Sequence, residues 1–208
     1  MKDDSHSTSR SMIFAYPLRD SLYLNITNRC QNACTFCIRQ TSGGVGYDLW
    51  LEREPSADEV VAAIGDPGRY REIVFCGYGE PLSRPEVVTE VARHIKERSS
   101  VPVRINTNGL ADLFLEDDVL PKLKGLIETV SISLNGHDAA TYYALTRSRF
   151  GLAAFDAILE FARRSKEYIP KVVFSVVRVP GVDIAAASRI AADLGVEFRV
   201  REMQGDNS

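Results

Sequence analysis

Ser21-Leu-Tyr-Leu-Asn-Ile-Thr27 is followed almost at once by Cys30-Gln-Asn-Ala-Cys34-Thr-Phe-Cys37. The first of these stretches is an apolar run, which predicts a β-strand. The three cysteines follow directly on this strand and therefore lie at its carboxyl end. Because ligands in parallel α/β folds gather at the carboxyl ends of the strands, this order predicts a thiol-based site at one edge of a sheet.

Beyond Pro55 the sequence alternates between extended and helical patterns. We expect strands over residues 72–77, 101–106, 126–134, 171–178 and 196–201, and helices over residues 56–64, 83–98, 110–124, 138–145, 152–167 and 184–194. Ser56 with Glu59, and Ser83 with Glu86, have the spacing of capping boxes. The strands are rich in β-branched residues and nearly continuous in apolar character, which is typical of a parallel sheet covered on both faces. An open doubly wound sheet and an incomplete barrel both fit this alternation.

The composition is that of an ordinary globular domain. The chain has 208 residues, of which 45% are hydrophobic and 25% charged, and this length fits one domain with its own core. Its net charge of −3 gives no electrostatic footprint for nucleic acid. We expect a disordered N-terminal tail over residues 1–12, one core domain over residues 13–203 and a polar C-terminal tail over residues 204–208.

Nothing in the sequence predicts a membrane span or a secretory signal. No stretch approaches the roughly 20 apolar residues that a span needs, and residues 1–11 lack an apolar core segment. We therefore expect a cytoplasmic protein, in which thiols stay reduced. Four cysteines in such a compartment require a chemical explanation before a disulfide one.

The three clustered cysteines leave few alternatives. A four-ligand zinc site usually repeats a two-cysteine unit, and the sequence contains no second unit. A thioredoxin-type redox pair of Cys34 and Cys37 would leave Cys30 without a role. The remaining interpretation is an iron–sulfur cluster held by three thiolates, with one iron left open to a further ligand.

The spacing Cys-x3-Cys-x2-Cys, with Phe36 before the last cysteine, resembles the radical S-adenosylmethionine (SAM) superfamily. The resemblance extends from about Leu18 to Arg201. More narrowly, the stretches over residues 22–30 and 131–138 are similar to the radical SAM proteins associated with TatD-family hydrolases. The resemblance implies a partial (β/α)6 barrel of the TIM type, which agrees with the six strands expected above.

The family resemblance also implies cofactors and an activity. A [4Fe-4S] cluster would bind Cys30, Cys34 and Cys37, and SAM would chelate its open iron. Reductive cleavage of SAM would give a 5′-deoxyadenosyl radical, which abstracts hydrogen from a substrate that the sequence does not identify. The radical chemistry belongs to the cofactor, and the protein supplies binding and orientation.

Three motifs at strand ends resemble the SAM-binding motifs of the family. Gly77-Tyr-Gly-Glu-Pro81 is similar to the glycine-rich motif that binds the SAM amine, and Asn106-Thr-Asn-Gly109 to a strand end near SAM. Two glycines allow close approach to the backbone. Ser131-Ile-Ser-Leu-Asn135 ends the predicted strand over residues 126–134, and the resemblance implies that this strand contributes groups near the SAM ribose. Each motif also fits an ordinary turn or a strand whose polar groups are satisfied locally.

The residues expected to bind cofactor are Phe36, Gly77, Tyr78, Gly79, Glu80, Pro81, Asn106, Thr107, Asn108, Ser133, Asn135 and Arg147. Arg147 is included because arginine can pair with the SAM carboxylate. Arg199 and Arg201 alternate on the last strand, so they are substrate-site candidates if their face is the barrel interior. Cys76 is either a thiol near the cluster or a small buried hydrophobe. No catalytic residue is assigned.

Three hypotheses about function follow. The first is a radical SAM enzyme that receives electrons from a reductant such as flavodoxin or ferredoxin. The second is a non-catalytic iron–sulfur or metal-binding module that partners a TatD-type hydrolase, and it predicts metal uptake without SAM binding. The third is a thiol redox protein that uses Cys34 and Cys37 and tolerates the loss of Cys30.

Overall fold

The computed structural model describes residues 12–41, 44–115 and 117–203. The predicted tails, residues 1–12 and 204–208, therefore lie outside the described residues except for Met12. One sheet of seven strands contains β1 (Ala15–Leu18), β2 (Ser21–Leu24), β3 (Glu72–Phe75), β4 (Val103–Thr107), β5 (Thr129–Ser133), β6 (Lys171–Val177) and β7 (Glu197–Arg201). β1 pairs antiparallel with β2, and every later pairing is parallel.

The strand order decides between the two expected architectures. The strands are neighbours in strict chain order from β1 to β7. A doubly wound sheet would need a point at which the order reverses, and no reversal occurs in the described sheet. Six parallel strands wound in one direction form an incomplete barrel, as the family resemblance predicted.

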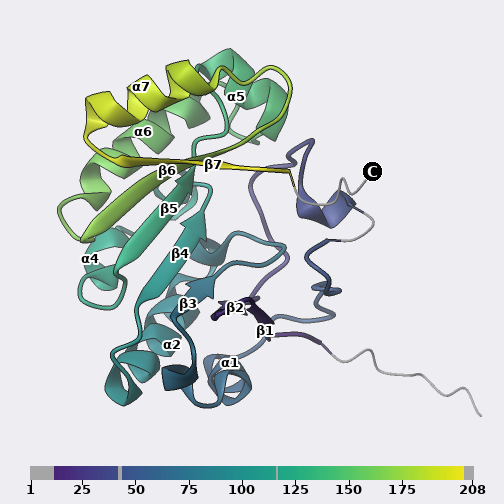
Figure 1. Cartoon of the computed structure of the whole chain (residues 1–208), viewed down its shortest axis with the longest axis vertical. Coiled ribbons are helices and arrows are strands. Elements are labelled where there is room, and N and C mark those ends of the chain that lie inside the picture. Colours follow the sequence, from purple (N-terminus) through teal and green to yellow (C-terminus); the bar gives the residue numbers. More distant parts are fainter. Residues whose placement is uncertain (1–11, 42–43, 116, 204–208) are drawn as a thin grey trace, which may run out of the picture.

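The helices are α1 (Ala57–Ile64), α2 (Pro85–Arg98), α3 (Ala111–Phe114), α4 (Leu120–Leu123), α5 (Ala139–Thr146), α6 (Ala153–Ser165) and α7 (Ile184–Leu194). Figure 1 shows α2, α4, α6 and α7 along one side of the curved sheet, whereas the segment between β2 and α1 follows the other side. We call the helix-covered side the outer face and the opposite side the inner face.

The two faces differ in chemistry because successive side chains of a strand point to opposite sides. Outer-face residues such as Leu24, Phe75, Ile132 and Phe174 are completely buried and belong to the main hydrophobic core. The inner face carries mostly polar groups, namely Ser21, Tyr23, Glu72, Cys76, Arg104, Asn106, Ser131, Ser133, Ser175, Arg199 and Arg201. The barrel therefore has an apolar outer layer and a polar interior.

Two predictions about helices are wrong. Ser83 does not cap α2, because it ends a 3₁₀ turn over Pro81–Ser83, and its hydroxyl accepts instead from Gln31. The single helix expected over residues 110–124 is two short helices, α3 and α4. Pro121 lies in the first turn of α4, where its missing N–H is tolerated, but it cannot continue a helix that arrives from α3.

The remaining differences are at the start of the sheet. The sequence pattern missed β1, whose four residues pair with β2 and cover its otherwise open edge.

The predicted caps of two helices are confirmed. Ser56 and Glu59 form the predicted capping box. α7 begins after Asp183 and ends at Gly195, as predicted.

Candidate functional site

The cysteine-bearing segment follows β2 and is fixed by backbone hydrogen bonds to the end of α5. The Ala33 N–H donates to the Thr146 carbonyl and the Thr35 N–H to the Leu145 carbonyl, both at 2.9 Å. In the other direction, the Arg149 N–H donates to the Gln31 carbonyl at 3.0 Å. These bonds are made by residues between the cysteines, and they fix the backbone of a segment that has no regular secondary structure.

The thiols of Cys30, Cys34 and Cys37 are free and half-buried. Burial, together with the neighbouring sulfurs of Cys30 and Cys37, raises the pKa of the Cys34 thiol to about 12. Burial and the Glu80 carboxyl also raise the pKa of Cys30. A thiol redox pair needs a cysteine with a lowered pKa, so the raised pKa of Cys34 argues against Cys34 as its reactive thiol.

The donor set fits an iron–sulfur cluster. In the described residues no group of three or more His, Cys, Asp or Glu side chains is arranged to hold a single metal ion. A cluster instead spreads its thiolate ligands over separate irons, and three soft donors without carboxylate or imidazole suit it. The positive irons of a cluster would stabilise the thiolates of Cys30 and Cys34, which burial disfavours in their absence.

The segment Gly77–Pro81 packs directly against the start of the cysteine segment. A Cβ on Gly77 would overlap the Asn25 side chain, and a Cβ on Gly79 would overlap the Thr27 and Arg29 carbonyls. The Glu80 N–H donates to the Arg29 carbonyl at 2.7 Å. On the Cβ side, the two glycines therefore make room for this chain rather than for a ligand.

The Glu80 carboxylate points into the protein. It accepts from the Leu82 N–H at 2.9 Å, the Thr107 hydroxyl at 2.8 Å and the Asn108 N–H at 2.6 Å. Burial raises the pKa of Glu80 to about 7, although all three donors oppose this rise. Glu80 thus ties the ends of β3 and β4 together, and Pro81 starts the 3₁₀ turn that follows it.

The end of β4 reaches the cysteines. The Asn108 side-chain amide donates to the Gln31 side chain at 3.1 Å and lies 4.0 Å from the Cys30 sulfur. Asn106 lies on the inner face and accepts from Arg104 at 2.6 Å, whereas Thr107 faces Glu80. Among the residues predicted to bind cofactor, Asn108 thus brings a side-chain N–H to a sulfur of the cysteine motif.

The other predicted residues are more widely spread. Ser133 is half-buried beside Ser175, and the Asn135 side chain accepts from the Val177 N–H at 3.2 Å. Arg147 is exposed in a left-handed conformation at the end of α5. Tyr78 packs edge-on against Trp50 with ring centroids 5.3 Å apart. Phe36 is half-buried between the second and third cysteines.

Two buried asparagines of the site were missed. The Asn25 amide donates to the Leu49 carbonyl at 2.8 Å and holds the returning segment against β2. Asn32, inside the cysteine motif, donates to the Tyr142 hydroxyl at 3.0 Å, while its Oδ1 is buried and has no partner among the described residues. A polar residue within an apolar run is the signal that could have identified Asn25.

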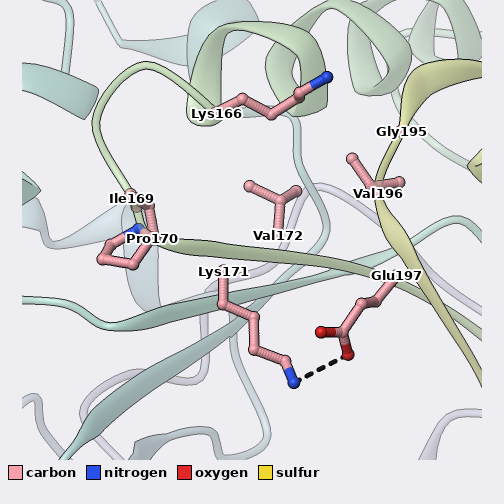
Figure 2. Close-up of a pocket in the computed structure, with 8 residues that line it drawn as sticks. All are labelled: Lys166, Ile169, Pro170, Lys171, Val172, Gly195, Val196 and Glu197. Atoms are coloured by element: carbon pink, nitrogen blue, oxygen red, sulfur yellow. Dashed lines mark ion pairs between the residues drawn. The ribbon is translucent and has the colours of Figure 1, made fainter.

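A separate hollow lies away from the cysteines. Figure 2 shows the residues that line it, at the amino-terminal ends of β6 and β7, with Lys171 paired to Glu197. The hollow has a volume of about 430 Å³, and the Lys171–Glu197 ion pair measures 2.8 Å. Lys166 points to the Leu194 carbonyl at 2.7 Å. Ligands of parallel barrels bind at the opposite, carboxyl ends of the strands, so we do not include this hollow in the site.

An incomplete α/β barrel with three free thiols after its first parallel strand defines the chain as an iron–sulfur protein of the barrel type. Residues 24–194 match the family model of the Radical SAM superfamily. The chain therefore belongs to the radical SAM superfamily, whose members are enzymes that bind a [4Fe-4S] cluster and SAM. Radical SAM enzymes need a reductant.

Curated relatives include a GTP 3′,8-cyclase from Lactiplantibacillus plantarum, 31% identical over 167 residues that cover 79% of this chain and 47% of the cyclase. A probable dual-specificity RNA methyltransferase RlmN from Rhodococcus erythropolis is 31% identical over 146 residues, covering 62% of this chain and 37% of that protein. The chain thus spans less than half the length of these relatives.

Among solved structures, Streptococcus suis SuiB bound to precursor peptide SuiA superposes with a TM-score of 0.66 at 16% identity. The superposition covers 89% of this chain and 39% of SuiB. At this identity the likeness supports the fold alone. Among the helices of the described residues, none has both the length and the apolar character that a membrane span requires.

Proposed function

We propose that this chain is a radical SAM enzyme whose cluster is held by Cys30, Cys34 and Cys37. The observation that carries the proposal is the convergence of this segment with Glu80 and Asn108 at the carboxyl ends of β3 and β4. When bound, the cluster supplies the electron that cleaves SAM to a 5′-deoxyadenosyl radical, which abstracts hydrogen from the substrate.

The protein groups position the cofactors. Backbone carbonyls of Gly77–Gly79 provide acceptors for the SAM amine, and Glu80 holds that backbone in place through its bonds to the end of β4. Asn108 directs an N–H toward the Cys30 sulfur, where such a contact tunes a cluster. Ser133 and Asn135, at the end of β5, are the candidates for the SAM ribose.

Arg147, Phe36 and Tyr78 lie around the cysteine segment, and in this proposal they contribute to the same site. Arg147 follows α5 directly where α5 is bonded to the cysteine segment, so its guanidinium is a candidate partner for the SAM carboxylate. Phe36 and Tyr78 come from the two segments that surround the cysteines and supply apolar surface beside them. Both assignments rest on position and on the family resemblance.

The finer classification is also a proposal. The stretches over residues 22–30 and 131–138 support membership of the group associated with TatD-family hydrolases, and hence a functional link to such a hydrolase. A cytoplasmic location and a reductant of the flavodoxin or ferredoxin type agree with the reduced thiols that the cluster needs.

The test is anaerobic reconstitution with iron and sulfide, followed by dithionite, SAM and an assay for 5′-deoxyadenosine. The wild-type protein is expected to bind about four irons and to release the nucleoside. Cys30→Ala, Cys34→Ala and Cys37→Ala should each abolish nucleoside formation. The matched control Cys76→Ala should retain the cluster, because Cys76 lies beside Asn106 of β4 rather than beside the three clustered cysteines.

Two results would contradict the proposal. Nucleoside formation that survives the loss of any of the three cysteines would remove them from the cofactor site. A cluster that assembles but neither binds nor cleaves SAM would instead favour the non-catalytic iron–sulfur module.

A further inference from the structure

β7 places two arginines on the inner face of the barrel. In the register, Arg199 lies beside Ser175 and Arg201 beside Val177 of β6. Paired residues of parallel strands point to the same side of a sheet, and Ser175 is in turn beside Ser133. Arg199 and Arg201 therefore belong to the same strand-end layer as the groups proposed for the SAM ribose.

The Arg201 guanidinium has one buried N–H group that makes no hydrogen bond to the described residues. That group is the Nε–H, which is fully buried. Two other largely buried arginines are bonded: Arg84 donates to the Ile26 and Pro55 carbonyls, and Arg104 to Glu72. A buried donor without a partner is destabilising, more so when it is charged, so a ligand that accepts from the Arg201 Nε would be stabilising.

Among the described residues, the charged groups around Arg201 also leave its positive charge without a carboxylate partner. Burial lowers the pKa of Arg201, the nearby Cys76 thiol opposes this shift, and the positive charges of Arg199 and Arg104 lower the pKa further. Glu72 is the carboxylate in this group, and Arg104 already holds it through contacts of 2.7 Å and 3.1 Å. The inner face thus concentrates positive charge in a chain whose net charge is −3.

We propose that Arg201, with Arg199 beside it, binds an oxyanion of the substrate, either a carboxylate or a phosphate. The proposal rests on the proposed function and adds the substrate class: an anionic molecule that enters the barrel with its acidic group at β7. The Nε–H and an Nη–H of arginine form a fork that matches two oxygens of such a group, which the single ammonium of lysine does not.

Binding would satisfy the buried Nε and offset the repulsion among the three arginines. It would also fix the orientation of the substrate, because a two-pronged contact at one end restrains the rest of the molecule. The two sources of oxyanion, carboxylate and phosphate, are separated by the probes used below.

The first measurement is an Arg Nε–H nitrogen correlation spectrum of the protein without cluster, titrated with inorganic phosphate and, separately, with acetate. Sodium chloride at equal ionic strength is the reference. We expect the Arg201 Nε–H signal to shift and saturate with at least one oxyanion. Saturation with phosphate alone assigns a phosphate group, and saturation with acetate assigns a carboxylate.

Arg201→Lys should weaken the saturable binding at least tenfold. Arg189→Lys makes the same exchange at an exposed position of α7 and should leave it unchanged. The proposal is overturned if neither oxyanion shifts the Arg201 signal beyond the chloride reference, or if Arg201→Lys binds as tightly as the wild type.

A second measurement separates this site from the cofactor site. Reconstituted Arg201→Lys should keep the cluster and the spectral response of the cluster to SAM, because Arg201 contacts substrate rather than SAM. Loss of the SAM response at unchanged iron content would assign Arg201 to SAM itself and overturn the substrate assignment. Failure of cluster assembly in the wild type would instead overturn the proposed function, without affecting the oxyanion titration.

Discussion

The outer and inner faces of the sheet are built from the same strands but carry different side chains, apolar on the outer face and mostly polar on the inner face. On the outer face, Leu24, Phe75 and Phe174 are fully buried against helices and contribute to stability through packing. On the inner face, groups such as Cys76, Arg104 and Asn106 alternate with them along the same strands. Because packing does not require polar groups there, we propose that the inner face contributes to the function of the chain.

The largest expected difference between the faces is in stability. Phe174→Ala on the outer face should lower the free energy of unfolding by about 3–5 kcal/mol, because it removes a completely buried ring from the core. Its neighbour Ser175→Ala on the inner face should cost less than about 1 kcal/mol. Urea denaturation of both variants measures the difference, and equal losses would contradict the division into two faces.

A second effect concerns Glu80 and pH. Its pKa of about 7 in the folded protein exceeds the ordinary value of 4.5, so the folded state binds the extra proton between these values. Stability from this group is complete below about pH 4.5 and is lost as pH rises through about 7, a change of about 3 kcal/mol.

Glu80→Gln has no carboxyl to titrate, so its unfolding free energy should lack this fall. Urea denaturation of the cluster-free wild type and variant from pH 4.5 to 8 gives the comparison. The control is Glu86→Gln, since Glu86 is exposed. Parallel pH profiles for wild type and Glu80→Gln would contradict the assignment of the raised pKa to Glu80.

The two glycines of the Gly77–Pro81 segment provide a third comparison. Gly79→Ala should destabilise the protein by about 1–3 kcal/mol, because its Cβ would overlap two backbone carbonyls of the cysteine segment. Gly68→Ala is the control, since its Cβ would meet side-chain oxygens of Asp66 and Ser99 and no backbone atom. Thermal unfolding measures both, and a Gly79→Ala protein as stable as Gly68→Ala would mean that the two segments are not packed as described.

The smallest expected effect is at Asn108. Asn108→Ala removes the N–H that points at the Cys30 sulfur, and fewer hydrogen bonds to the sulfurs should make the reduction potential of the cluster more negative. Redox titration of the reconstituted protein measures the change. A control, Asn106→Ala, alters an inner-face amide that bonds to Arg104, and it should change the potential less.

The sequence predicted best what depends on neighbouring residues. The Ser56 capping box and the bounds of α7 between Asp183 and Gly195 follow from local hydrogen bonds and backbone preferences, and they were predicted correctly. The six parallel strands were also predicted, because their outer-face residues form apolar runs.

What the sequence missed depends on distant contacts. Ser83 has the spacing of a cap but is bonded to Gln31, which lies 52 residues away. The glycines at 77 and 79 were interpreted as an approach path for a ligand, whereas their Cβ side is filled by residues 25–29. The unpartnered Nε of Arg201 is likewise visible only once β7 is placed beside β6.

The most direct measurement is the electron paramagnetic resonance spectrum of the reconstituted, dithionite-reduced protein, recorded with and without SAM. We expect a reduced [4Fe-4S] signal that changes when SAM is added, because SAM binds the iron that has no cysteine ligand. The same spectrum with and without SAM, in a protein that holds the full complement of iron, would contradict the assignment of this chain as a SAM-cleaving enzyme.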